Sequence, residues 1–209
     1  MTQFLPRCRT IHLKLLAAFA VALPLAAADC AGSAGTAVAA APARFAPPVV
    51  HDGLNDFDFV IGDWQVHLKK LLNPLTGSTN WVEYTGTSKM RKILDGRGNL
   101  EEFEVDSPEN HLHIQAQTLR LYNPDSHQWA IYLLDAAKGK LAEPPTVGAF
   151  TNGLGEFYDY EDFGGHWILV RYQWFNVSPQ EARMEQSFSM DGGKNWEVNW
   201  ICELSRDKA

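Results

Sequence analysis

The chain has 209 residues, and its 25 acidic and 18 basic residues give a net charge of −7 at neutral pH. This length suffices for one ordinary domain with a substantial core. The negative charge argues against nucleic acids and anionic membranes as partners, because both would be repelled.

Residues 1–28 predict a cleaved secretory signal peptide. An apolar run ends at Leu25 and is too short to span a bilayer comfortably. Ala26-Ala27-Ala28 then provides the small-residue pattern at which signal peptidase cleaves. Cleavage would remove three basic residues and no acidic ones, and leave 15 basic against 25 acidic residues. We therefore expect a periplasmic or secreted protein with a net charge near −10.

Residues 29–53 predict a spacer without regular structure. The segment is rich in Ala, Gly and Pro and contains Pro47-Pro48. Lipidation at Cys30 is the alternative to a soluble product. Asp29 disfavours it, because a lipobox normally has Gly, Ala or Ser at that position.

Residues 54–209 predict one all-β domain. Short runs of β-forming residues alternate with turn signals such as Asn-Pro, Asp-Gly and Gly-Gly, at the spacing of a sandwich or barrel. The ten candidate strands are 57–71, 79–94, 99–105, 112–122, 127–135, 147–152, 155–163, 166–176, 182–190 and 195–205.

The last two candidate strands predict an antiparallel hairpin with one buried face on each strand. One apolar face groups Ala182, Met184, Gln186, Phe188 and Met190, and the other groups Trp196, Val198, Trp200, Cys202 and Leu204. Strands that bury one face fit an antiparallel meander, and closing the meander removes its exposed edges. We expect a single up-and-down β-barrel.

The stretch 189–196, "SMDGGKNW", matches the Asp-box pattern S-x-D-x-G-x-x-W of secreted glycosidases. The Asp and Gly residues of such a box shape a turn, and the Trp packs beneath it. Propeller glycosidases repeat the box once per blade, but it occurs once here. We therefore interpret it as the turn of the last hairpin.

Two resemblances support the barrel. Gly62-x-Trp64, in "FDFVIGDW", resembles the lipocalin and wider calycin signature, in which Gly lets the backbone pass closely and Trp plugs the closed end. Segments across 55–206, including "GTSKMRKILDGRGNLEEF" and "EQSFSMDGGKNWEVNWICELSR", resemble the DUF1579-type family of exported, uncharacterised bacterial proteins. That resemblance implies a calycin-like barrel and supplies no catalytic residues.

A more distant resemblance is to haem-binding barrels of the nitrobindin type. Their haem ligand is a His late in the barrel, whereas this chain has no His after His166. We therefore expect no cofactor.

Other patterns of reactive residues do not form a convincing site. His111 and His113 could share a metal if a third ligand came from elsewhere, but we interpret them as solvated strand histidines. Asp56 and Asp58 lack a visible partner across a cleft, as glycoside chemistry would need. No nucleophile motif is present. We expect no catalytic residue and no metal site.

The aromatic residues point instead to binding. A barrel of this size is either filled by side chains or holds one small ligand. By strand alternation Arg171 shares a face with Trp167 and Gln173, so we expect these three and Trp129 to bind an acidic headgroup and apolar tail inside the barrel.

Three functions remain open. The leading one is an exported barrel that binds a small apolar or amphipathic molecule. The alternatives are an enzyme acting on a small or carbohydrate substrate at the barrel mouth, and a filled barrel that acts through its surface on another protein. The sequence does not fix the oligomeric state.

Overall fold

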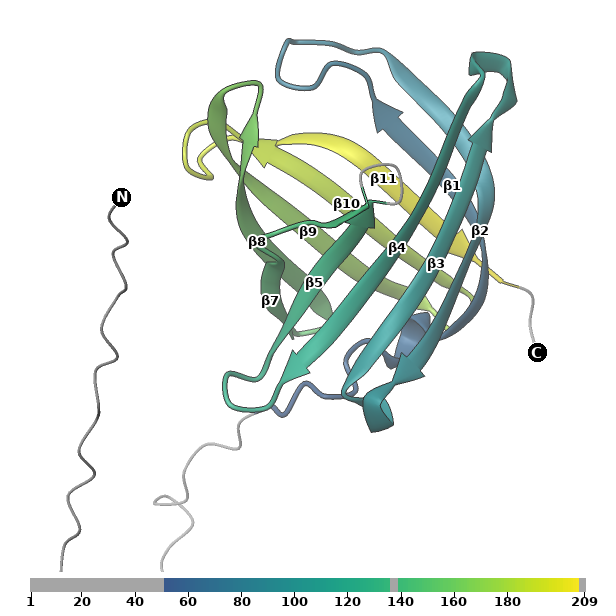
Figure 1. Ribbon diagram of the computed structural model, residues 1–209, viewed down its shortest axis with the longest axis vertical. Coiled ribbons are helices and arrows are strands. Elements are labelled where there is room, and N and C mark those ends of the chain that lie inside the picture. The colour runs from purple at the N-terminus through teal and green to yellow at the C-terminus, as the bar shows by residue number, and fades with distance from the viewer. Residues whose placement is uncertain (1–50, 136–138, 207–209) are drawn as a thin grey trace, which may run out of the picture. The chain divides into compact units, whose positions relative to one another are not determined.

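The computed structural model describes residues 51–135 and 139–206 (Figure 1). The predicted signal peptide, Cys30 and most of the predicted spacer lie outside these residues. The first described residues, His51 to Gly53, already contact the barrel: the Trp129 indole N–H donates to the Gly53 carbonyl at 2.9 Å. Among the described residues, no helix has the length and apolar character needed to cross a membrane.

Ten antiparallel strands form a closed barrel, as predicted. Each strand pairs with its neighbour along the chain, and pairing of β1 with β11 closes the ring. A two-residue strand, β6, pairs with the end of β5. The next strand, β7, pairs with the beginning of β5, so β5 and β7 are neighbours in the ring. The strands are β1 (Gly62–Leu71), β2 (Trp81–Ile93), β3 (Gly98–Ser107), β4 (Leu112–Asn123), β5 (Gln128–Asp135), β6 (Lys140–Leu141), β7 (Thr146–Thr151), β8 (Leu154–Phe163), β9 (His166–Ser178), β10 (Glu181–Ser189) and β11 (Glu197–Ser205).

Short 3-10 turns occupy three of the connections at the barrel ends. They are η2 (Asp58–Val60), η3 (Leu94–Gly96) and η4 (Pro108–Asn110). The first of these, η2, precedes β1 and lies at the end of the barrel where β1 begins and β11 ends. We call this the closed end, because buried residues of the N-terminal segment fill it.

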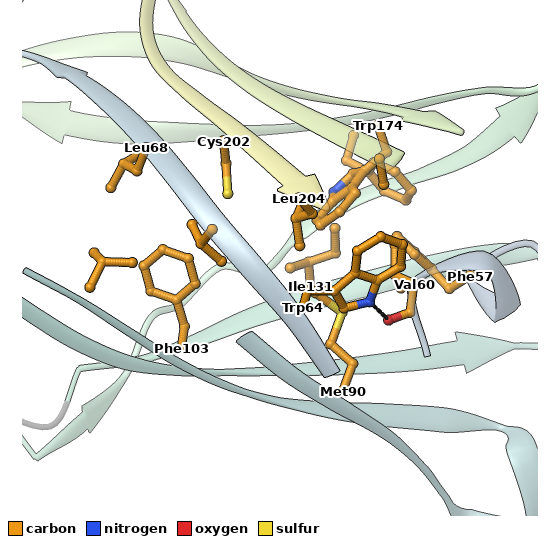
Figure 2. Packing of buried hydrophobic residues seen from close by; sticks show 14 of the residues in the cluster. Phe57, Val60, Trp64, Leu68, Met90, Phe103, Ile131, Trp174, Cys202 and Leu204 are labelled. Carbon is orange, nitrogen blue, oxygen red and sulfur yellow. Dashed lines mark hydrogen bonds between the residues drawn. The ribbon is translucent and has the colours of Figure 1, made fainter. Parts of the chain in front are cut away.

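Phe57 forms the centre of the closed end. It is 1% exposed, and its ring lies 4.9–5.7 Å from the rings of four inward-facing residues, Trp129, Phe150, Phe157 and Trp174. Edge-to-face and stacked aromatic pairs at such distances contribute beyond their buried area. The segment before β1 therefore seals the barrel with aromatic packing (Figure 2).

Trp64 completes this seal, as the Gly62-x-Trp64 signature predicts. Its indole N–H donates to the Val60 carbonyl at 2.7 Å (Figure 2). The Arg206 guanidinium stacks 4.0 Å from the Trp64 ring and donates to the Ile61 carbonyl at 2.8 Å. Gly62 has a φ of +123°, and a Cβ there would meet this guanidinium at 3.0 Å. Only glycine fits that backbone beside Arg206 without strain.

A β-bulge divides β11 into two halves that face different ways. Gln186 pairs with Trp200 while Ser187 pairs with Val198, so Asn199 is the extra residue. Trp200, Cys202 and Leu204 consequently face the interior, whereas Val198 faces outward and Trp196 packs on the outer surface. The prediction that these five residues share one face is therefore wrong.

The Asp box forms the turn between β10 and β11. The Asp191 carboxylate accepts hydrogen bonds from the backbone N–H groups of Asn195 (2.9 Å) and Lys194 (3.0 Å) and from the Ser189 hydroxyl (2.8 Å). These bonds, led by the one from the Asn195 backbone, lower the Asp191 pKa to about 2. Their contribution to stability is present above the ordinary pKa and is lost as pH falls from there through about 2.

The turn also needs glycine at two positions, and these provide a matched test. Gly192 and Gly193 have φ values of +72° and +89°. A Cβ at Gly193 would meet the Trp196 ring at 3.3 Å and Leu169 at 3.4 Å, whereas a Cβ at Gly192 would meet nothing within 4 Å. We expect Gly193→Val to lower the free energy of unfolding by ~1–3 kcal/mol, measured by urea denaturation, and Gly192→Val to cost less. An equal loss of unfolding free energy in both variants would show that backbone strain alone, and not packing beneath the turn, is the reason for glycine at position 193.

Candidate ligand-binding site in the open half of the barrel

Trp129 is the one predicted site residue that faces the interior. It is 2% exposed and lies edge-on to Phe57, with 5.2 Å between the ring centroids. Its indole N–H is already bonded to the Gly53 carbonyl. Trp129 is therefore part of the packing at the closed end.

Arg171, Trp167 and Gln173 lie on the outer face of β9, so their predicted place inside the barrel is wrong. The Arg171 guanidinium lies 4.3 Å from the ring of Trp196, which the Asp-box turn folds over the outer surface. Gln173 donates to Glu156 at 3.0 Å, and Trp167 is 71% exposed.

The error arose because both faces of β9 carry apolar and aromatic residues. Alternation alone therefore could not decide which face of β9 points into the barrel. The inward face is made of Ile168, Val170, Tyr172 and Trp174.

The two histidines considered as possible metal ligands do not act together. His111 precedes β4 in a left-handed conformation with a φ of +53°. His113 lies on the outer face beside Asp106, at 2.8 Å. Across residues 51–135 and 139–206, no group of three or more His, Cys, Asp or Glu side chains is placed to hold a metal ion.

The buried apolar residues form two separate clusters. The large cluster fills the closed end and continues along β1 to β3. A small cluster of Ile168, Val170 and Phe188 lies near the open end, covered by Leu75 from the β1–β2 loop. Tyr172 packs against both clusters.

Inward-facing side chains between the clusters are only half-buried. We call these residues the middle layer: Lys70, Asp159, Tyr172, Gln186 and Trp200. Cross-strand pairing joins most of them in one row, since Lys70 pairs with Trp200, Trp200 with Gln186, and Gln186 with Tyr172. Nearer the mouth, the inward-facing Leu133 and Phe163 are 42% and 37% exposed. The open half is thus less tightly filled than the closed end.

A buried ion pair lies beside the closed-end aromatic cluster. Arg120 is 1% exposed and donates to Glu101 at 2.5 Å and to Asn99 at 3.0 Å. Its guanidinium lies 5.2 Å from the Phe57 ring and 5.0 Å from the Trp174 ring. Removing one partner of such a pair leaves an uncompensated buried charge, which is strongly destabilising.

The wall formed by β7, β8 and β9 is acidic. Asp159 accepts a hydrogen bond from the Thr146 hydroxyl at 2.7 Å through one carboxylate oxygen. Burial raises the pKa of Asp159, and burial together with the charge of Asp159 raises the pKa of Glu161. Burial, followed by these two carboxylates, also raises the pKa of Tyr172.

Several buried polar atoms of the interior have no hydrogen-bond partner within the described part of the chain. They include Asp159 Oδ1 and Arg120 Nε, and on β11 the Trp200 Nε1 and Asn199 Nδ2. Leaving a buried polar group unpaired costs ~1–3 kcal/mol. Because native proteins pair nearly all such groups, the two unpaired atoms of the middle layer, Asp159 Oδ1 and Trp200 Nε1, indicate a water or a ligand there.

Sequence reasoning missed the middle layer, although one signal was available. Counting by twos from Trp64, which the signature places inside, assigns Val66, Leu68 and Lys70 to the same face. In "EFYDYEDF", the same alternation puts Asp159 and Glu161 inside and Tyr158 and Tyr160 outside.

Comparison with known proteins supports the fold. No family model matches the chain, so membership of the DUF1579-type family is not confirmed. No curated protein matches it either. Among solved structures, the barrel is similar to the S-type phycobiliprotein lyase CPES from Guillardia theta, with a TM-score of 0.52 and 11% sequence identity. The match covers 73% of this chain and 91% of that chain, and at this identity it shows a shared lipocalin-like fold.

The buried carboxylate of Asp159 gives a pH-dependent test. Its pKa is raised, so the ionised form destabilises the fold; the penalty is absent below the ordinary pKa and grows as pH rises through the raised value. We expect Asp159→Asn to raise the Tm at pH 7 by roughly 2–4 °C, the effect of about 1 kcal/mol in a domain of this size.

The gain should shrink as pH falls toward and below the ordinary pKa of an aspartate, because Asp159 is then neutral in the folded and the unfolded protein, as asparagine always is. Asp162→Asn is the control, because Asp162 lies on the outer face of the same strand and an Asn can keep its bond from the Gly165 N–H. A gain in Asp159→Asn that did not change with pH would contradict the assignment.

Proposed function

We propose that this chain is an exported, lipocalin-like protein that binds a small, largely apolar ligand in the open half of its barrel. The observation that carries the proposal is the contrast between the two halves. The closed end is packed with aromatic rings, whereas the middle layer stays half-buried and holds unpaired polar atoms. Ligand sites commonly combine apolar walls with a few such polar groups.

Export rests on the sequence alone, through the basic start, the apolar run and Ala26-Ala27-Ala28. The resemblance to DUF1579-type exported proteins belongs to the same proposal. The structural neighbour is named as a phycobiliprotein lyase, and a lipocalin-like fold of this kind is compatible with a small-molecule ligand. Fold does not by itself imply function, so the proposal rests on the residues of the site.

The open half can be blocked without disturbing the closed end. Ala116 faces inward from β4, is half-buried, and pairs with Phe103, whose ring lies 6.4 Å from that of Trp200. Gln117 is its exposed neighbour on the outer face. We expect Ala116→Trp to weaken binding of a neutral apolar dye such as Nile red at least tenfold, and Gln117→Trp to leave the affinity unchanged.

Dye titration followed by fluorescence measures both affinities, and thermal melting confirms that both variants fold. Native mass spectrometry of the wild-type protein from its own source would identify a co-purifying ligand. Equal dye affinity in the two tryptophan variants would place the binding site outside the barrel. No dye binding and no co-purifying molecule would end the proposal.

A further inference from the structure

The inner wall at β1 and β11 carries two hydrogen-bond donors, the Lys70 ammonium and the Trp200 indole N–H. Lys70 and Trp200 are cross-strand partners, both face inward, and the Lys70 Nζ lies 5.6 Å from the centre of the Trp200 ring. Lysine and the tryptophan indole can only donate hydrogen bonds. This wall is therefore chemically opposite to the acidic wall at β8.

The donors on this wall lack partners among the described residues. The Trp200 Nε1 is buried and bonds to nothing there, and Lys70 takes part in no ion pair. The adjacent Lys69 differs, because it faces outward and pairs with Glu83 at 3.2 Å.

Neither glutamate of β11 forms an ion pair with Lys70 in the described part of the chain. Glu197 accepts the backbone N–H of Leu75 at 2.6 Å. Glu203 lies on the outer face, where Arg183 donates to it at 2.7 Å. The wall thus combines a cation with an indole N–H, and neither bonds to an anionic side chain within the described residues.

We infer that Lys70 and Trp200 form a recognition site for the carboxylate of an amphipathic ligand. The inference rests on the proposed function and names the ligand class: an acid with an apolar body. One ammonium and one indole N–H suit the two oxygens of a carboxylate. The acidic wall at Asp159 and Glu161 would repel the same group, so the ligand binds with its acid toward β1 and β11.

The experiment compares decanoate with decan-1-ol, which share a chain and differ in headgroup charge. Both are measured by displacement of Nile red at pH 8, where decanoate is ionised. The wild-type protein should prefer decanoate by roughly tenfold to a hundredfold, the effect of a hydrogen bond to a charged group. Lys70→Met should abolish this preference, and Lys69→Met should retain it.

Trp200→Phe keeps the ring and removes the N–H, so it should weaken decanoate binding while the protein still binds the dye. Equal affinity of wild type for the acid and the alcohol would overturn the carboxylate site but leave the apolar site intact. Tighter binding of monodecyl phosphate than of decanoate would overturn the choice of carboxylate. Failure of dye, acid and alcohol alike would overturn both the inference and the proposed function.

Discussion

The structure depends on the aromatic seal that Phe57 and Trp64 form at one end of the barrel. Eight strands enclose a space that wall side chains can just fill, and ten strands enclose a wider one. Wall residues alone would leave that wider interior open at both ends. The segment before β1 supplies the missing volume, and Arg206 fastens it by stacking on Trp64 and binding the Ile61 carbonyl.

The ion pair between Arg120 and Glu101 lies beside this seal. A charged pair in a protein interior is costly to desolvate and adds little net stability unless its remaining groups are bonded. Here Asn99 and Ser88 supply further hydrogen bonds, and the rings of Phe57 and Trp174 flank the guanidinium. The pair therefore introduces polarity next to the aromatic packing, and Arg120 Nε is left unpaired among the described residues.

The strand pattern and the closed barrel could be predicted because turn residues separate every strand and Gly62-x-Trp64 marks the sealed end. Which face of β9 points inward could not be predicted, because Trp167 and Leu169 on one face are as apolar as Ile168 and Val170 on the other. The bulge at Asn199 could not be predicted either, because no residue type marks it. It places Trp196 on the outer surface and Trp200 in the interior.

Prediction of the candidate site from the sequence was limited in the same way. An interior site for an amphipathic ligand could be suggested from the fold. Trp129 does face the interior, but it belongs to the packing at the closed end. The residues that give the site its chemistry could not be chosen by residue type. Lys69 and Lys70 are identical in kind, and only their distance from Trp64 along β1 decides which one faces inward. Arg171 was selected as the charged residue among aromatics, but its aromatic neighbour, Trp196, lies on the outer surface.

A barrel sealed at one end has a kinetic consequence for whatever it holds. A ligand bound as proposed would enter and leave through the open end, where Leu75 of the β1–β2 loop covers the small apolar cluster and its N–H donates to Glu197. An incoming molecule cannot push an occupant out from behind. Exchange must therefore pass through an empty barrel, so the rate of replacement would be set by how fast the first occupant leaves and would not rise with the concentration of its competitor.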